Sequence, residues 1–338
     1  MSWRDELLRR FPALQNLPPN SVVVGGAIRD LILGREPADV DVECAGAESV
    51  AKSVGKVIPL GRGEMRVFRV VRGDRVYDFS EPTELGRRDF TMNAMSLDLA
   101  SGDVRDPFDG EEDARRGLLR MIRAENFQDD PLRILRGVRL ALQDDFKIED
   151  RTMAAMRRRA AHVTTVAAER VSYELDVIFS AGKFRRAVQL LNESGLDEPL
   201  FGYTLDANAF HSDDVSCAGA FALILREPSQ FADRWKWSRE LLRKVVGFQR
   251  LLRDPNLLAI FEADARELPS LFKAVGRPAP PMPDFATRPL LDGDEIGKLT
   301  GAEGPRLGAL KRALIEAQLK GEVRTKDEAI AFVLTASK

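Results

Sequence analysis

The amino-acid sequence predicts an α+β protein, with a mixed strand-and-helix segment first and a long all-helical segment after it. In the first 110 residues, short apolar runs end at glycines or turn-forming pairs, which is typical of strands joined closely to helices. After the run Asp-Pro-Phe-Asp-Gly at 106–110, apolar residues recur at intervals of three and four, which indicates amphipathic helices. The 338 residues are 44% hydrophobic, which is enough for a sizeable core and two or three domains.

Glycines mark the boundaries of several expected elements in the first segment. These elements are, in chain order, a strand at 21–24, a helix at 27–33, a strand at 40–43, a hairpin of strands at 66–71 and 75–79, and a strand at 93–99. In the second segment, helices are expected at 129–143, 149–161, 168–180, 183–194, 215–225, 237–252, 255–264, 304–320 and 326–336. A proline-rich linker at 277–289 precedes the last two helices.

Charge and cysteine content narrow the class of protein. A net charge of −2 does not by itself indicate a nucleic-acid binder, so any RNA contact has to come from locally clustered arginines and lysines. Cys44 and Cys217 lie far apart in the sequence, which predicts neither a disulfide framework nor a zinc site. The N-terminus does not resemble a signal peptide and no run of about 18 apolar residues is present. We therefore expect a cytoplasmic protein without a membrane partner.

The first group of residues with chemical potential combines two glycines with two aspartates. Gly25-Gly26 leads from a strand into a helix, where backbone N–H groups and Arg29 can approach a triphosphate. Asp39 and Asp41 are two apart on the next strand, so their side chains share one face. Paired carboxylates suit Mg²⁺, and two such ions can activate a hydroxyl and stabilise leaving pyrophosphate. Either motif alone is more often a tight turn or a solvated edge strand, but the combination favours nucleotidyl transfer.

Asp78 is the candidate third catalytic carboxylate. It lies on the expected hairpin strand at 75–79 and would complete the metal site from a neighbouring strand. An ordinary exposed aspartate on a strand explains the residue equally well, and both interpretations stay open.

A second group follows at 87–95, Arg-Arg-Asp-Phe-Thr-Met-Asn-Ala-Met. Arg88 offers a forked donor for phosphate, Asp89 can fix that fork or accept a hydroxyl, and Asn93 has both donor and acceptor groups. Such a set can hold the phosphates and ribose of a nucleotide. The alternative is a surface cluster of ion pairs at the start of a helix.

A third group lies at the start of the expected helix 129–143. Pro131 suits a first helical turn, and Asp130 and Arg133 are expected to share one helix face. An acid and a guanidinium held side by side can read the Watson–Crick edge of a base, while Arg136 and Arg139 continue the stripe towards phosphates. The alternative is a capping acid beside a solvated basic face.

Taken together, these motifs resemble those of the class II tRNA nucleotidyltransferases and bacterial poly(A) polymerases, and they occur in the same order. The motifs are GGAIRD and DVD at 25–41, RRDFTMNAM at 87–95, DPFDG at 106–110, DDPLRILRGVRLA at 129–141 and ERVSYEL at 169–175. The similarity is strong over about 20–180 and resumes at 293–332, which looks like a tRNA-binding tail. It implies a nucleotidyltransferase-type head at 1–110, a nucleotide-selecting neck at 111–180, a helical body at 181–276, and a linker with a helical tail at 277–338.

The resemblance also implies a role for each candidate residue. Asp39 and Asp41 would hold the metal ions. Gly25, Gly26 and Arg29 would face the triphosphate. Arg88, Asp89 and Asn93 would hold the sugar and phosphates of the incoming nucleotide. Asp130 and Arg133 would pair with the base, and Glu169 and Arg170 would brace the neck.

The implied function is addition of the 3′-terminal CCA nucleotides to tRNA, with tRNA and CTP as partners and no DNA. Only seven residues, 80–86, lie where CCA-adding relatives usually have a much longer loop, and this shortening resembles enzymes that add only CC. The alternatives are full CCA addition from CTP and ATP, a poly(A) polymerase, a non-catalytic RNA-binding protein and a small-molecule nucleotidyltransferase. The tail-like segment favours tRNA, and the complete set of site residues argues against a non-catalytic protein.

Overall fold

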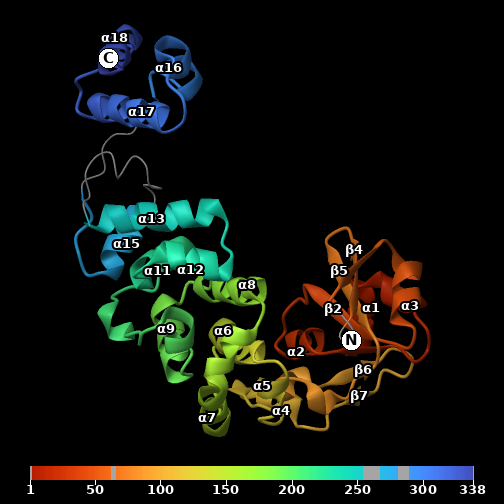
Figure 1. Cartoon of the computed structure of the whole chain (residues 1–338). Helices are drawn as coiled ribbons and strands as arrows, with labels where there is room; N and C mark the ends of the chain where they lie inside the picture. Colours follow the sequence, from red (N-terminus) through yellow and green to blue (C-terminus); the bar gives the residue numbers. More distant parts are fainter. Residues whose placement is uncertain (1, 62–65, 254–266, 281–288, 338) are drawn as a thin grey trace. The chain divides into compact units, whose positions relative to one another are not determined.

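The computed structural model of the chain describes residues 2–61, 66–253, 267–280 and 289–337 (Figure 1). The chain divides into two compact units. The first unit comprises Met1–Ala181 and Ala187–Leu205, and the second comprises Gly182–Arg186 and Asp206–Lys338. In the part of the chain that the structure describes, no helix combines the length and the apolar character needed to span a bilayer.

A seven-stranded mixed sheet forms the N-terminal part of the first unit, as expected for the α+β class. Its strands are β1 Val22–Val24, β2 Asp39–Glu43, β3 Val57–Leu60, β4 Val67–Arg72, β5 Arg75–Ser80, β6 Ser96–Asp98 and β7 Val104–Arg105, in the spatial order β3-β4-β5-β2-β1-β6-β7. Strands β2 and β5 are parallel, and the other neighbours are antiparallel. The hairpin predicted around Gly73-Asp74 is confirmed, with Arg72 opposite Arg75.

One face of this sheet is apolar and carries the core. Val40 and Val42 on β2 and Tyr77 and Phe79 on β5 are buried, because side chains alternate between the two faces of a strand. Helices α1 Trp3–Arg10, α2 Gly26–Ile32 and α3 Ala47–Val54 contribute their buried residues to the same cluster (Figure 1). The residues in between, including Asp41, therefore lie on the opposite face, where Asp39 and Asp41 are exposed.

Short helices continue the first unit. They are α4 Gly110–Arg115, α5 Asn126–Asp129, α6 Leu132–Gln143, α7 Asp150–Arg159, α8 Ala168–Phe179 and α10 Asp197–Phe201, together with most of α9 Phe184–Glu193. A small parallel pair, β8 Leu118–Leu119 with β9 Lys147–Ile148, lies among them. Helix α6 buries Ile134, Leu135 and Val138, and it packs along α8. The apolar side of α6 is therefore buried within the helical part of the unit.

Two sequence predictions in this unit were wrong in detail. The helix expected at 129–143 is two helices, because Asp130 adopts an extended conformation with φ −142° and ψ 96°. The pyrrolidine ring of Pro131 disfavours helical geometry for the residue before it. Asp130 and Arg133 therefore do not share a helix face. The strand expected at 93–99 is shorter, since Thr91–Asn93 forms a 3₁₀ turn, η4.

The second unit is helical in its described residues. Its elements are α11 Cys217–Ile224, α12 Pro228–Trp235, α13 Arg239–Arg253, α15 Leu268–Ala274, α16 Gly293–Thr300, α17 Gly304–Leu319 and α18 Lys326–Ala336. The last three share a core of their own around Ile296, Leu314 and Val333. The helix predicted at 255–264 and the centre of the linker at 277–289 lie outside the described residues.

Candidate active site

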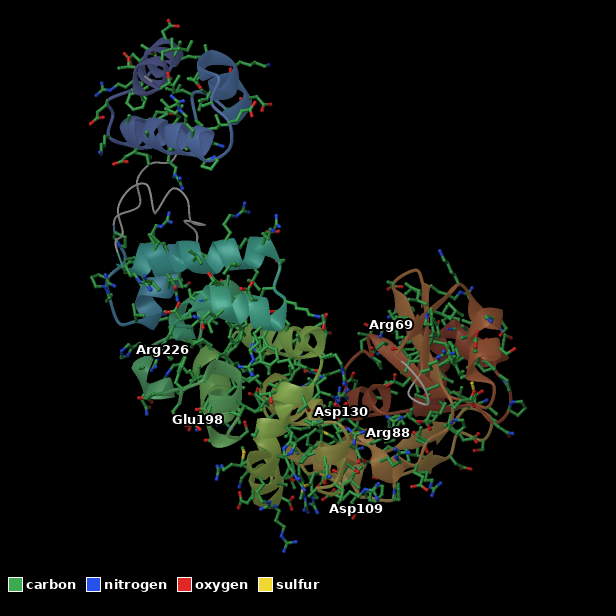
Figure 2. All side chains as sticks on the ribbon, viewed as in Figure 1. Arg69, Arg88, Asp109, Asp130, Glu198 and Arg226 are labelled. Carbon is green, nitrogen blue, oxygen red and sulfur yellow. The ribbon has the colours of Figure 1, made fainter. Side chains whose placement is uncertain are left out.

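A row of charged side chains crosses the open face of the sheet. Asp39 and Asp41 lie on that face of β2, and Asp78 is directly opposite Asp41 on the parallel strand β5. Asp78 is in turn opposite Arg69 on β4. Arg69 is labelled in Figure 2. Arg69 binds Asp78 through two bonds, from Nε to Oδ1 at 2.8 Å and from Nη2 to Oδ2 at 2.6 Å. The predicted third carboxylate thus lies beside Asp41 but is engaged by an arginine, and its catalytic role stays a prediction.

Arg69 was not among the residues predicted for this site, although the sequence carries a signal for it. The two-residue turn at Gly73-Asp74 fixes the register of the hairpin, and counting back from it pairs Arg69 with Asp78. Neighbouring Phe68 and Val70 are buried, so Arg69 has to face the other side.

The carboxylates of Asp39 and Asp41 form a pair that suits a divalent cation. Both can be reached by solvent, but the surrounding protein replaces part of their hydration and raises the pKa of Asp41 to about 6. Arg88 counteracts this rise, while Asp39 and Asp78 add to it. Burial, followed by the charge of Asp78, also raises the pKa of Asp39. Among the described residues, neither carboxylate has a Lys or Arg nitrogen within ion-pair distance.

Within the described ranges, no group of three or more His, Cys, Asp or Glu side chains is arranged around a metal position. This is compatible with Mg²⁺, which is usually held by one or two carboxylates together with substrate phosphates. The fit rests on two carboxylates whose charges repel one another and which form no ion pair with the described residues.

Gly25 lies where the glycine motif, the carboxylates and Arg88 meet. Its φ of +75° is favourable only for glycine, and a Cβ there would lie 2.8 Å from Arg88 Nη1 and 3.4 Å from Asp41 Oδ2. Gly26 begins helix α2, and a Cβ on Gly26 would lie 3.5 Å from Arg29 Nη2. The predicted triphosphate-binding residues are therefore neighbours of the carboxylate pair.

Two hydrogen bonds and one ion pair connect helix α2 to helix α6 in series. Arg29 Nη1 donates to Asn93 Oδ1 at 2.8 Å, and Asn93 Nδ2 donates to Asp89 Oδ1 at 3.1 Å. The other oxygen of Asp89 lies 3.1 Å from Arg136 Nε. Burial opposes ionisation of Asp89, but the charge of Arg136 and the hydrogen bond from Asn93 outweigh it and lower the pKa. This chain links the motif at 87–95 to the motif at 129–141.

A cavity of about 790 Å³ lies beside these groups and has the size of a small-molecule site. It is lined by Glu43, Arg66, Val67, Ser80, Glu81, Pro82, Thr83, Glu84, Arg87, Arg88, Asp89, Asp130, Arg133 and Arg136. Arg88 and Asp130, both labelled in Figure 2, come from separate motifs and share this space. The cavity therefore brings together five of the predicted nucleotide-binding residues, and the short connection after β5 supplies part of its wall.

Asp130 and Arg133 reach the cavity from separate anchors. Arg170 Nη2 donates to Asp130 Oδ2 at 2.8 Å, and Arg133 Nη1 donates to the carbonyl oxygen of Asn126 at 3.0 Å. Burial lowers the pKa of Arg133. Arg139 lies further along α6, where its Nε is 2.7 Å from Glu174 Oε2 on α8. The predicted contact of Arg139 with a nucleotide stays a prediction.

Comparisons with known proteins identify relatives of this chain. The model of the "Poly A polymerase head domain" matches residues 65–120, and that of the "Probable RNA and SrmB- binding site of polymerase A" matches residues 145–207. The A-adding tRNA nucleotidyltransferase of Deinococcus radiodurans is 30% identical, with 97% of this chain and 98% of the relative covered. The CC-adding tRNA nucleotidyltransferase of Thermus thermophilus is 29% identical over 94% of each chain. The CCA-adding enzyme of Streptococcus uberis is 28% identical over 96% of each.

Solved structures agree with these relatives at the level of fold. The Bacillus stearothermophilus CCA-adding enzyme in complex with CTP has a TM-score of 0.71 and 24% identity, over 99% of this chain and 98% of the other. The Thermotoga maritima CCA-adding enzyme complexed with tRNA has a TM-score of 0.62 and 21% identity, over 99% and 95%. The similarity extends through both units of the chain.

Proposed function

This chain belongs to the family of class II tRNA nucleotidyltransferases and bacterial poly(A) polymerases, and we propose that it adds C residues to the 3′ end of tRNA. The observation that carries the proposal is the cavity in which Arg88, Asp89 and Arg133 meet beside a pair of carboxylates. Cationic and hydrogen-bonding groups there suit a nucleoside triphosphate, and the carboxylates suit the metal ions that the family generally uses.

The proposed reaction is a phosphoryl transfer. The 3′-hydroxyl oxygen of the RNA attacks the α-phosphorus of CTP, a new P–O bond forms, and the P–O bond to pyrophosphate breaks. Asp39 and Asp41 would hold Mg²⁺, which lowers the pKa of the attacking hydroxyl and offsets charge on the leaving group. Gly25, Gly26 and Arg29 face the triphosphate in this proposal, and Arg88 adds a fixed cation next to Asp41.

Base selection is assigned to Asp130 and Arg133. Because Arg170 fixes Asp130 and a backbone carbonyl fixes Arg133, both side chains are held in place before a base enters. A pre-arranged acceptor and donor can pair with the edge of cytosine, and a base that leaves them unpaired is disfavoured. Asp89 and Asn93 would hold the ribose, and the chain from Asp89 to Arg136 links that sugar site to α6.

The connection after β5 supports CC addition over full CCA addition. The seven residues at 80–86 span at most about 25 Å when fully extended, which leaves little freedom to reshape the cavity for a purine. Glu81 is also fixed, because it accepts hydrogen bonds from the backbone N–H groups of Gly46 and Ala47 at 3.3 and 2.9 Å. Relatives that add A, CC and CCA match at similar identity, so the comparisons do not separate these activities. Full CCA addition from CTP and ATP is the second candidate.

Product sequencing tests the proposal. Purified protein is incubated with Mg²⁺, CTP and ATP and with two tRNAs, one ending at the discriminator base and one ending in CC. CC addition predicts that the first tRNA gains two C residues and that the second is unchanged. A terminal A added at a rate near that of C indicates CCA addition, and extension of only the second tRNA indicates A addition. Long A tracts on an RNA unrelated to tRNA would identify a poly(A) polymerase instead.

A further inference from the structure

Glu43 is a buried carboxylate on the catalytic strand that the proposed reaction does not use. It follows Asp39 and Asp41 with the period of two that keeps a side chain on the same face of β2. Only 4% of the residue is exposed, which is unusual for a glutamate unless it is paired and hydrogen-bonded. It lies two residues after Asp41 on β2, and it also lines the cavity.

Both oxygens of Glu43 are bonded to groups that shape the cavity. Oε1 accepts from the hydroxyl of Thr83 at 2.7 Å and from Arg88 Nη2 at 2.8 Å. Oε2 accepts from the backbone N–H of Thr83 at 3.2 Å. A single side chain thus ties the connection after β5 to the strand that carries the catalytic carboxylates, and it also ties Arg88 to that strand.

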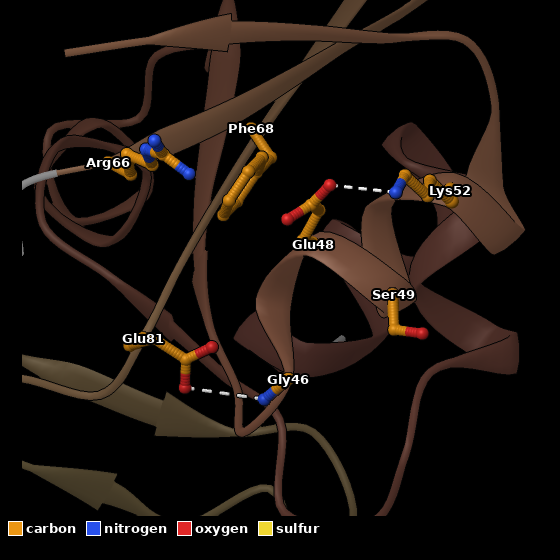
Figure 3. A pocket seen from close by; sticks show the side chains of 7 residues that line it. All are labelled: Gly46, Glu48, Ser49, Lys52, Arg66, Phe68 and Glu81. Atoms are coloured by element: carbon orange, nitrogen blue, oxygen red, sulfur yellow. Dashed lines mark hydrogen bonds and ion pairs between the residues drawn. The ribbon is translucent and has the colours of Figure 1, made fainter. Parts of the chain in front are cut away.

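Other contacts fasten the same connection along its length. Figure 3 shows Glu81 directed at the backbone of Gly46, just before helix α3. At the far end, the side chain of Asn126 donates to the carbonyl oxygens of Gly86 and Arg88 at 2.9 and 2.6 Å. The connection is therefore held at both ends, and Glu43 holds its middle through Thr83.

Arg88 is aimed by the same carboxylate. Its Nη2 is bonded to Glu43, and its Nη1 lies against Gly25, where a Cβ would approach to 2.8 Å. The guanidinium is near enough to Asp41 to counteract part of the rise in the pKa of that carboxyl. Because Glu43 holds Nη2 of the Arg88 guanidinium, Nη1 stays directed at Gly25 and at the nearby Asp41.

We propose that Glu43 is a positioning residue that sets nucleotide specificity by fixing the cavity wall through Thr83 and by aiming Arg88. The inference rests on the proposed function. With the wall fixed, the cavity keeps one shape, and a purine cannot gain space by displacing residues 80–84. Because Arg88 is fixed before the nucleotide binds, its side chain loses little conformational entropy when it pairs with the triphosphate.

Thr83→Val and Thr83→Ser form the matched test. Valine keeps the volume of threonine but removes the hydroxyl that Glu43 accepts, whereas serine keeps the hydroxyl. The experiment measures kcat/KM for CTP and for ATP with tRNA ending at the discriminator base and with tRNA ending in CC. We expect Thr83→Val to raise the ATP-to-CTP ratio by about tenfold, the order of a modest pocket discrimination. We expect Thr83→Ser to stay within about twofold of wild type.

Glu43→Gln tests the second half of the proposal. The amide replaces one acceptor oxygen by a donor, so it faces either the N–H of Thr83 or the guanidinium of Arg88 with the wrong polarity. We expect the same rise in the ATP-to-CTP ratio together with a lower kcat for CTP, because the aim of Arg88 is lost. Glu48→Gln is the control, since Glu48 forms an exposed pair with Lys52 on α3 (Figure 3).

The outcomes separate the inference from the proposed function. A wild-type protein that adds no nucleotide to either tRNA overturns the proposed function and the inference with it. A wild type that adds C, with a folded Thr83→Val variant that keeps the wild-type ATP-to-CTP ratio, overturns the inference alone. Equal effects of Thr83→Val and Thr83→Ser also overturn it. Thermal unfolding of each variant shows that it is folded, and the threonine pair decides the question where Glu43→Gln fails to fold.

Discussion

Replacing Gly110 by alanine tests how tightly two of the sequence motifs are packed together. Gly110 begins helix α4, where its N–H donates to Asp106 Oδ1 at 2.8 Å. A Cβ at this position would lie 2.2 Å from the carbonyl oxygen of Thr91 and 2.7 Å from the carbonyl carbon. Thr91 belongs to the turn η4 that holds Asn93 against Arg29 and Asp89. The substitution therefore pushes on the backbone that positions the proposed sugar site.

The size of the effect follows from the geometry. Since real Cβ atoms essentially never approach closer than 3.0 Å, the contact at 2.2 Å requires a shift of about 0.8 Å (3.0 − 2.2). Overpacking of this kind costs about 1–3 kcal/mol of the free energy of unfolding. For a unit of this size, each kcal/mol lowers the Tm by about 2–4 °C, so a fall of about 2–12 °C is expected. A misplacement near 1 Å also lowers kcat/KM by about a hundredfold.

Two measurements on purified Gly110→Ala check these values, a thermal unfolding curve and the rate of C addition to tRNA at subsaturating CTP. Gly247→Ala is the control, because a Cβ there has no heavy atom within 4 Å and the residue lies inside helix α13. The control should keep its activity and gain up to about 1 kcal/mol in stability. If Gly110→Ala unfolds at the wild-type temperature and keeps its wild-type kcat/KM, the close packing of α4 on η4 is refuted.

Three further predictions concern the proposed chemistry. Asp41→Ala should lower the rate of transfer by at least about a hundredfold without lowering the Tm, because a metal ligand is lost and no core packing is lost; activity above a few per cent of wild type would contradict a metal role. Arg133→Ala should lower the preference for CTP over other nucleotides by about tenfold or more, and an unchanged preference at reduced rate would argue against base reading. Deletion of residues 290–338 should weaken tRNA binding and flatten its salt dependence, measured by filter binding between 50 and 200 mM salt, as roughly expected for lost phosphate contacts. Equal affinity of both proteins at every salt concentration would remove the tail from tRNA binding.

The sequence was most informative where structure is set by neighbours in the chain. An apolar run ending at two glycines predicted β1, alternation predicted β2, and the turn pair at Gly73-Asp74 predicted the hairpin, each to within one or two residues. The same alternation predicted that Asp39 and Asp41 share a face. Helices α8 and α18 were predicted closely for the corresponding reason, since each is long enough to show a repeat of three and four.

The sequence predictions were wrong where one local preference outweighed another, and they were incomplete where a segment was too short to show a periodic pattern. The spacing of Asp130 and Arg133 suggested a common helix face, but Pro131 disfavours helical geometry at Asp130, which is extended. Helices α12 and α15, of eight and seven residues, were missed because such short segments give few repeats to count. The bond from Glu43 to Arg88 joins residues 45 positions apart, and no pattern in one sequence encodes a partner at that distance.

The arrangement of the site explains why its residues come from separate motifs. Metal-binding carboxylates need a rigid and solvent-accessible mount, which the open face of a sheet provides, whereas base reading needs side chains that project across a cavity from another element. Rigid coupling between the two is then required, because transfer fails when the base is bound correctly but the α-phosphate is displaced. In the proposed mechanism, the chain from Arg29 through Asn93 and Asp89 to Arg136 would supply that coupling across the proposed sugar site, and Glu43 would supply it across the cavity wall. These charged side chains therefore have two roles in the proposal. They pair with one another, and they fix the distance between the metal-binding carboxylates and the residues that read the base.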